Sequence, residues 1–88
     1  MTQKSRTKDE FFLVKLHELA VRSGDLFKEI DRYEIGKEIG QNDKGVDTIV
    51  NLLAQANFIK KTEGATLHLT EQGYRLAEAL VKEFTFSP

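Results

Sequence analysis

The stretch from Ile35 to Lys61, IGKEIGQNDKGVDTIVNLLAQANFIKK, decides the fold because it joins two helical patterns through a short polar turn. Gly40 stands where the first pattern stops, and the left-handed conformation that ends many helices favours glycine. In the turn that follows, Asn42 or Asp43 can cap the second helix with a side-chain oxygen. The stretch therefore predicts two helices separated by a tight turn.

These two helices can be placed more closely from their caps and apolar faces. We predict the first over residues 32–39, with Asp31 in the capping position, and the second over about residues 44–56. Asn57 closes the second helix, because asparagine tolerates a positive φ. The first helix is predicted to bury Tyr33 or Ile35, together with Ile39. The apolar stripe of the second consists of Val46, Ile49, Val50 and Leu53.

A longer helix is predicted before this stretch. Thr7 and Glu10 have the spacing of a capping box, in which each side chain satisfies the other residue's backbone N–H. The helix that starts there ends near Gly24. Its face repeats at three- and four-residue steps and consists of Phe12, Leu13, Leu16, Leu19, Ala20 and Ser23. Residues 25–30 then predict either an extended linker or a brief edge strand.

After Asn57 the hydrophobic period changes from helical to alternating. Residues 58–62 and 66–70 predict two strands of a hairpin around Glu63-Gly64-Ala65, whose glycine suits a turn. Thr70 is a suitable N-cap for a final helix over about residues 71–84.

This order of elements is that of a winged helix-turn-helix domain. The stretch IGKEIGQNDKGVDTIVNLLAQANFIKK resembles bacterial and archaeal winged-helix regulators, including MarR-like ones, and LHLTEQGYRLAEAL is similar to the segment after their wing. The resemblance covers residues 31–80. It implies a mainly α fold with a small β-hairpin wing (α+β), in which a C-terminal helix follows a three-helix core. The chain departs from the pattern at the tip of the wing, where Glu63 stands in place of the arginine that DNA-binding wings often carry.

The organisation expected from this resemblance is one domain between two tails. Residues 1–6 would be a flexible basic N-terminal tail, residues 7–84 the winged-helix domain and residues 85–88 a C-terminal tail. A chain of 88 residues suffices for one modest core.

Composition and missing motifs narrow the functional classes. The chain has no cysteine, which excludes disulfides and thiolate metal sites, and no apolar run approaches the length of a membrane span. We therefore expect a cytoplasmic protein without membrane association. His17 and His68 have no second histidine or cysteine at ligand spacing, so no metal is expected. No nucleophile or phosphate-loop motif is present, so we expect neither enzyme activity nor a cofactor.

The resemblance also implies a binding face. In the resembling regulators the third helix enters the major groove of DNA. The corresponding outward residues and the lysines of the wing are Lys44, Asp47, Thr48, Asn51, Gln55, Lys60 and Lys61. Asn51 and Gln55 can pair with adenine, and Thr48 can contact a phosphate or a thymine methyl group. The alternative interpretation is that these residues form only the solvated side of a helix.

Charge argues against DNA on this face. The whole chain carries a net charge of −1, and residues 31–57 hold five acids against three bases, which gives −2. Duplex binders depend on basic side chains that neutralise phosphates. Asp47 is the main difficulty, because it lies on the predicted face and repels phosphate.

The sequence is therefore compatible with two functions. The first is a homodimeric transcriptional regulator that binds double-stranded DNA and has no ligand domain. The second is a winged-helix module that binds another protein and does not bind DNA. An apolar surplus favours dimerisation through the first and last helices, although these helices could also cover it within one monomer. This surplus consists of Phe11, Phe12, Leu26, Phe27, Phe84 and Phe86.

Overall fold

The computed structural model describes residues 7–85, with side chains up to Glu83. Within this part of the chain, four helices and three strands follow one another. They are α1 (Lys8–Ser23), β1 (Ile30–Asp31), α2 (Arg32–Ile39), α3 (Asp43–Gln55), β2 (Ile59–Lys61), β3 (Thr66–Leu69) and α4 (Glu71–Thr85). The prediction of a mainly helical α+β chain with a small hairpin is confirmed. The tail predicted over residues 1–6 lies outside the described residues, as do residues 86–88 of the tail predicted over residues 85–88, whereas Thr85 is the last residue of α4.

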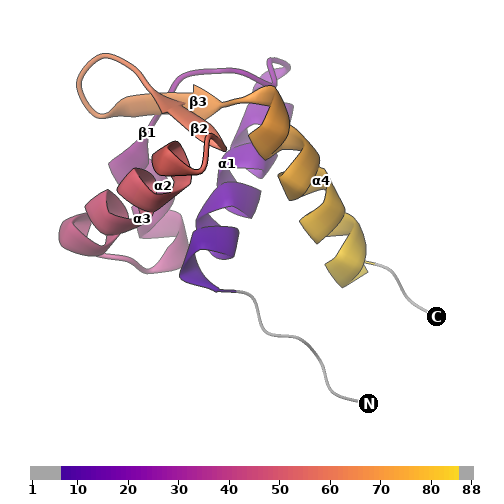
Figure 1. Cartoon of the computed structure of the whole chain (residues 1–88), viewed down its shortest axis with the longest axis horizontal. Helices are drawn as coiled ribbons and strands as arrows, with labels where there is room; N and C mark the ends of the chain where they lie inside the picture. Colours follow the sequence, from indigo (N-terminus) through magenta and orange to yellow (C-terminus); the bar gives the residue numbers. More distant parts are fainter. Residues whose placement is uncertain (1–6, 86–88) are drawn as a thin grey trace.

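Helix α1 lies in the middle of the molecule, with α2 and α3 on one side and α4 on the other (Figure 1). A three-stranded antiparallel sheet in the order β1-β3-β2 lies across one end of the helices. Of residues 25–30, only Ile30 lies in an edge strand, where it pairs with Leu67, and residues 25–29 form the connection from α1. The loop of the β2–β3 hairpin lies above α2 and α3 in this view, on the side away from α4 (Figure 1).

The core lies where α1, the α2–α3 pair and the inner face of the sheet meet. Its fully buried large side chains are Phe12, Leu13, Leu16, Ile35, Val46, Val50, Ile59, Leu67 and Leu69. The α3 stripe predicted from the sequence is buried, and Ile35 rather than Tyr33 is the fully buried residue of α2. Burial of this apolar surface is the main stabilising contribution in a domain of this size.

Side-chain caps set the helix boundaries. Both bonds of the predicted capping box are present, with Thr7 N–H donating to Glu10 Oε1 at 2.9 Å and Glu10 N–H to Thr7 Oγ1 at 3.2 Å. In the α2–α3 turn the cap is Asn42, whose Oδ1 accepts from Gly45 N–H at 2.8 Å. Asn57 adopts a positive φ of 66°, as predicted.

Helix α4 approaches the start of the hairpin so closely that only glycine fits at the contact. A methyl group at Gly73 would overlap the backbone carbonyl of Phe58. Thr70 fixes the same junction, since its Oγ1 donates to the carbonyl oxygen of Asn57 at 2.6 Å and accepts from Gly73 N–H at 3.0 Å. Gly36 has an equivalent role between helices, because a methyl group there would overlap the side chain of Val46.

Helices α1 and α4 pack against each other within the chain. This packing corresponds to the alternative in which the terminal helices cover the apolar surplus within one monomer. Phe12 is fully buried, whereas Phe11 and Phe27 are 47% and 46% exposed. The side chain of Phe84 and all of Phe86 lie outside the described residues. Self-association remains a prediction.

His17 is a buried polar residue of α1 that lies against α4. It is 8% exposed, and its ring lies 5.6 Å from the ring of Tyr74 on α4. Its Nε2 lies 3.5 Å from Glu78 Oε2 and makes no hydrogen bond.

The contact at Gly73 gives a stability prediction. We expect Gly73→Ala to lower the free energy of unfolding by about 3 kcal/mol, because the backbone carbonyl of Phe58 cannot move aside without displacing the hairpin. Urea denaturation followed by circular dichroism measures the change.

Gly45→Ala in α3 is the matched control. The nearest atom to its added methyl group is the flexible Oε1 of Gln41, at 2.7 Å, and alanine favours a helix over glycine by about 1 kcal/mol. This variant should be at least as stable as the wild type. A Gly73→Ala protein of wild-type stability would contradict the close approach of α4 to the hairpin.

Candidate functional site

A line of four polar side chains runs along the outer side of α3. Lys44, Thr48, Asn51 and Gln55 follow one another at spacings of four, three and four residues, which places them on one side of a helix. All four are exposed, and they lie opposite the buried stripe of the same helix. Beside them, Leu52 is 50% exposed, the largest exposed fraction of an apolar residue on α3. We call these four residues and Leu52 the α3 face.

Asp47 lies on the flank of α3 that faces α2, and its charge is engaged there. Its Oδ1 accepts a hydrogen bond from Tyr33 Oη at 2.8 Å and lies 3.4 Å from Arg32 Nη1. The carboxylate side chain is 49% exposed, whereas that of Arg32 is 12% exposed. Asp47 as a DNA-contacting residue stays a prediction, and the structure shows its carboxylate held against the start of α2.

The same arginine also connects α2 to the hairpin. Arg32 Nε donates to the carbonyl oxygen of Ala65 at 3.2 Å, and its backbone N–H donates to the same oxygen at 3.0 Å. Arg32, Tyr33, Asp47 and Ala65 therefore form a brace between α2, α3 and the hairpin loop. No pattern in the sequence indicates this brace, because Arg32 and Ala65 are 33 residues apart.

The brace affects the acidity of its tyrosine. The hydrogen bond to the Asp47 carboxylate is the largest cause that raises the pKa of Tyr33 above its usual value of 10.0, followed by desolvation and the negative charge of Asp47. Ionised Tyr33 would place two negative charges side by side, so the phenol keeps its proton more tightly in the folded chain.

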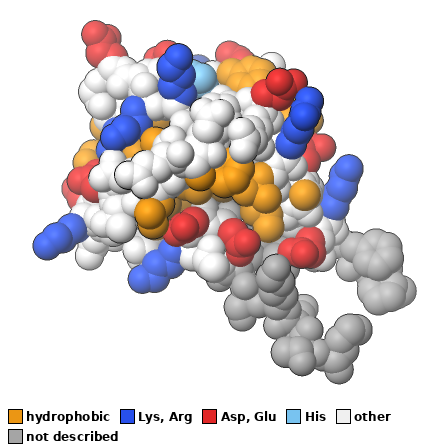
Figure 2. All heavy atoms as spheres, viewed as in Figure 1, with side chains coloured by type: hydrophobic (Ala, Val, Ile, Leu, Met, Phe, Trp, Pro, Cys, Tyr) orange, Lys and Arg blue, Asp and Glu red, His pale blue; other side chains and the backbone are white. Residues whose placement is uncertain are grey.

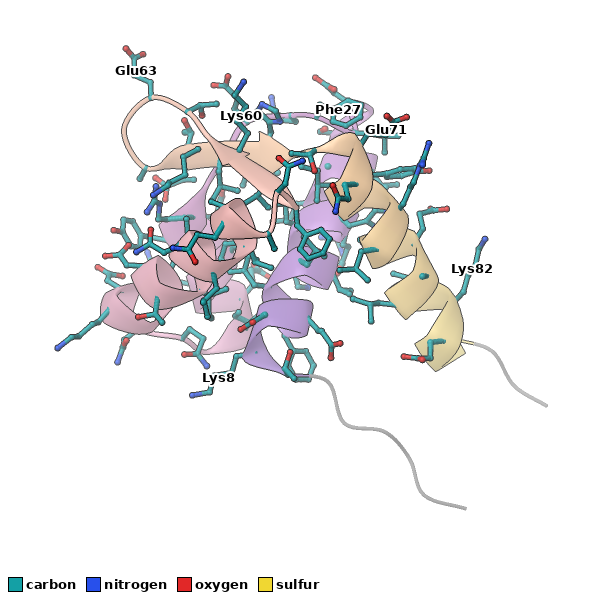
Figure 3. All side chains as sticks on the ribbon, viewed as in Figure 1. Lys8, Phe27, Lys60, Glu63, Glu71 and Lys82 are labelled. Carbon is teal, nitrogen blue, oxygen red and sulfur yellow. The ribbon has the colours of Figure 1, made fainter. Side chains whose placement is uncertain are left out.

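The two lysines predicted on the hairpin point to opposite faces of strand β2. Lys61 lies toward α3, where its Nζ donates to Asn51 Oδ1 at 2.9 Å. Lys60 is paired across the strands with His68 and points outward from the sheet, away from the helices (Figure 3). The structure thus brings Lys61 together with the α3 face and separates Lys60 from it, as successive residues of a strand require.

Charges around the candidate site are mixed in sign. Figure 2 shows basic and acidic side chains interspersed over one face of the molecule, with hydrophobic side chains gathered near its centre. Exposed acids close to the site are Asp43 in the first turn of α3 and Glu63 in the hairpin loop, which points into solvent (Figure 3). Among the described residues, Lys44 adds a positive charge on the α3 face, and Lys61 adds one beside it.

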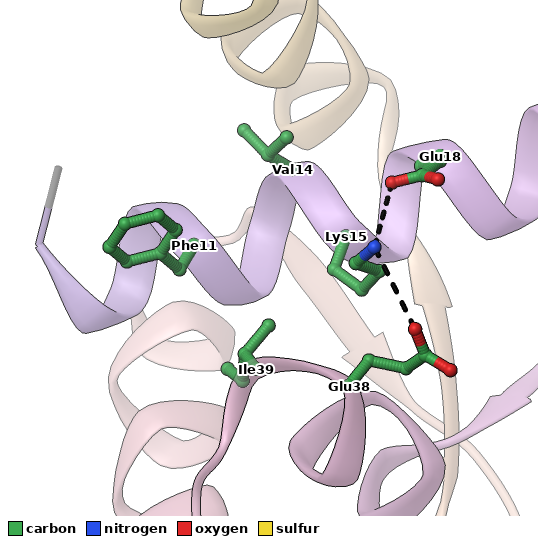
Figure 4. A pocket seen from close by; sticks show the side chains of 6 residues that line it. All are labelled: Phe11, Val14, Lys15, Glu18, Glu38 and Ile39. Carbon is green, nitrogen blue, oxygen red and sulfur yellow. Dashed lines mark hydrogen bonds and ion pairs between the residues drawn. The ribbon is translucent and has the colours of Figure 1, made fainter.

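A second surface feature lies between α1 and the end of α2 (Figure 4). It is an open hollow of about 380 Å³ with an apolar part formed by Phe11, Val14 and Ile39. Lys15 forms the polar rim, with its Nζ 2.9 Å from Glu18 Oε1 and 3.8 Å from Glu38 Oε1. The hydrogen bond from Lys15 is the largest cause that lowers the pKa of Glu18. Such a hollow can accept an apolar side chain.

The described residues contain no group of three or more histidine, cysteine, aspartate or glutamate side chains that could hold a metal ion. Over the same residues, 7–85, no helix is long and apolar enough to cross a membrane. We found no match to this chain among protein-family models, curated proteins or solved structures.

The brace predicts a measurable tyrosine titration. In a Tyr74→Phe background, Tyr33 is the only tyrosine in the chain, and ultraviolet absorbance of the phenolate reports its ionisation directly. We expect its pKa to lie above 10.0 and to fall when Asp47→Ala removes the hydrogen bond and the charge. The pKa of Tyr33 is higher in the folded chain than in the unfolded chain. The bond therefore makes its full contribution to stability at pH values below the unfolded-state pKa, and this contribution is lost as the pH rises through the folded-state pKa.

Asp43→Asn is the control for charge alone, because Asp43 makes only the smallest contribution to the shift and has no hydrogen bond to Tyr33. It should change the titration much less than Asp47→Ala does. If both substitutions change the pKa of Tyr33 equally, the shift comes from nearby negative charge alone and not from the hydrogen bond to Asp47.

Proposed function

We propose that residues 7–85 form a winged-helix domain that binds duplex DNA, with α3 in the major groove and Lys61 against the phosphate backbone. The order of the elements supports this proposal, since α2, a tight turn, α3 and a hairpin follow one another as in such domains. An α-helix with its side chains is about 10–12 Å across and fits a major groove about 12 Å wide.

The engagement of Asp47 is the observation that carries the proposal. A free carboxylate in the middle of α3 would oppose phosphate approach, but this one accepts a hydrogen bond from Tyr33 and lies beside the guanidinium of Arg32. The negative potential over α3 is reduced accordingly, because the opposite charge is only 3.4 Å away. The outer side of α3 then carries one cation and three neutral polar side chains.

The geometry of the face suits several successive base pairs. Lys44 and Gln55 are separated by eleven residues, or about 16 Å along the helix at 1.5 Å per residue. This length corresponds to roughly five base pairs at 3.4 Å each. Lys61 reaches the same face from the hairpin, so a duplex against α3 would also meet the hairpin.

The electrostatic part of this binding is expected to be small. With Lys44 and Lys61 as phosphate contacts, the logarithm of the association constant should fall with the logarithm of salt concentration with a slope of about −2. Binding would therefore be weak at physiological salt and measurable at low salt. A regulator with this property depends on base contacts or on a second copy for its affinity.

The second candidate is a protein-binding module, and one observation favours it. Leu52 is half exposed on α3, and helices that dock in a groove of a partner protein do so through apolar anchors. In this case the α3 face would contact a partner protein through Leu52 and its polar neighbours. The two candidates make opposite predictions for DNA.

A titration of fluorescent duplex DNA at several salt concentrations is the test. We expect binding at low salt with a slope near −2, and Lys61→Ala should weaken binding to every duplex and reduce the magnitude of the slope by about 1. Lys60→Ala is the matched control, because it removes the same charge from the neighbouring position on the outer face of the sheet. It should leave the slope unchanged.

If no duplex is bound at the lowest salt concentration, the proposal is wrong and the protein-binding candidate stands. If Lys60→Ala and Lys61→Ala weaken binding equally, DNA contacts the chain without using the α3 face, and the docking arrangement proposed here fails.

A further inference from the structure

We infer that the α3 face selects A·T base pairs in the major groove, through Asn51 and Gln55 on adenine and through Leu52 and Thr48 on the thymine methyl group. This inference rests on the proposed function, and it names the class of DNA site that the face recognises. It follows from the chemistry of the exposed side chains and from the contacts that orient them.

Two carboxamides lie on the outermost line of α3. Asn51 and Gln55 are four residues apart, so their side chains project from the same side of the helix on successive turns. A carboxamide can accept from the N6 amino group of adenine while it donates to N7, which is a pairing that no other base offers in the major groove. Two such groups at this spacing suit two adenines a short distance apart.

Asn51 is oriented before any ligand is bound. Lys61 Nζ donates to its Oδ1 at 2.9 Å, which fixes the oxygen toward the hairpin and directs the NH₂ group the other way. A carbonyl oxygen has two lone pairs and the Lys61 ammonium has three N–H donors, so Oδ1 can accept from adenine while Lys61 stays bound to it and also donates to a phosphate. The contact therefore reduces the rotamer entropy that Asn51 loses on binding.

Apolar groups lie beside these amides. Leu52 follows Asn51 directly and is 50% exposed. Thr48 Oγ1 donates back to the carbonyl oxygen of Lys44 at 3.2 Å, which leaves the methyl group as the part of its side chain without a polar contact. The thymine C5-methyl group is the one apolar group that a base pair presents in the major groove. A face that combines carboxamides with methyl groups is complementary to adenine paired with thymine.

Guanine readout has weaker support on this face. The commonest guanine contact is a bidentate arginine, and α3 contains no arginine. Arg32 is committed to Asp47 and Ala65, and Arg22 and Arg75 lie on α1 and α4, where each pairs with a glutamate. Lys44 and Lys61 are assigned to phosphates by the proposed function.

The first experiment compares duplexes of equal length and charge whose central six base pairs are either A·T or G·C. Fluorescence anisotropy at low salt should give at least about tenfold tighter binding to the A·T duplex, which is the discrimination expected from one well-placed bidentate pair. Equal binding of the two duplexes, or preference for G·C, would overturn this inference and leave the proposed function standing. Absence of binding to both would overturn the two together.

A·T-rich DNA also differs in groove width, so a second experiment separates base contacts from shape. Replacement of adenine by 7-deazaadenine removes the N7 acceptor, and replacement of thymine by uracil removes the methyl group, while both keep the minor-groove edge of the base pair. We expect the first change to weaken binding about tenfold and the second a few-fold.

Single variants assign each effect to its residue. In the Asn51→Ala variant, 7-deazaadenine should weaken DNA binding much less than in the wild type, whereas uracil should weaken it as before. In the Leu52→Ala variant, uracil should weaken binding less, and 7-deazaadenine should weaken it as before. Lys60→Ala should keep both, because that side chain lies on the outer face of the sheet. All three positions are exposed, so the fold should tolerate the changes, and circular dichroism checks this. If the A·T preference changes with neither base analogue, it comes from DNA shape, and the inference is overturned.

Discussion

The bond between Asp47 and Tyr33 joins α3 to α2 beside the α3 face. It connects the first turn of α2 to the middle of α3, and through Arg32 the connection extends to Ala65 in the hairpin loop. An ion pair that is half exposed contributes about 1 kcal/mol or less to stability. Its main effects are therefore to fix the relative orientation of α3 and the hairpin and to remove a free negative charge from the outer side of α3.

A steric constraint at the other end of the hairpin complements this polar one. Gly73 lets the first turn of α4 lie directly on the Phe58 carbonyl. At the same junction, the hydroxyl of Thr70 hydrogen-bonds both the carbonyl oxygen of Asn57 and the N–H of Gly73. The hairpin is thus held at its base by α4 and at its loop by α2. With both ends fixed, the backbone at Lys61 is held beside α3, within reach of Asn51.

Features that depend on neighbours in sequence could be predicted, and those that depend on distant partners could not. Capping by Thr7, the left-handed Asn57 and the buried stripe of α3 are local, and the structure confirms each of them. The contact between Asp47 and Tyr33 could not be predicted, because the two residues are fourteen apart on different helices and no periodicity links them. Alternation along β2 does place Lys60 and Lys61 on opposite faces, so that separation was available from the sequence and was missed. The α3 face itself follows from helical spacing, whereas the hydrogen bond from Lys61 that orients Asn51 required the structure.

A face of this composition has a consequence for how the domain would work as a regulator. Phosphate contacts provide affinity for any sequence, whereas base contacts provide the difference between sequences. With two lysines and two carboxamides, the ratio of specific to non-specific binding would be favourable even though the affinity of one domain is low. Two copies on neighbouring half-sites would add their binding free energies and raise affinity without further basic residues. The near-neutral charge of the chain, which first argued against DNA, is therefore compatible with a binder whose affinity comes from pairing two selective but weak contacts.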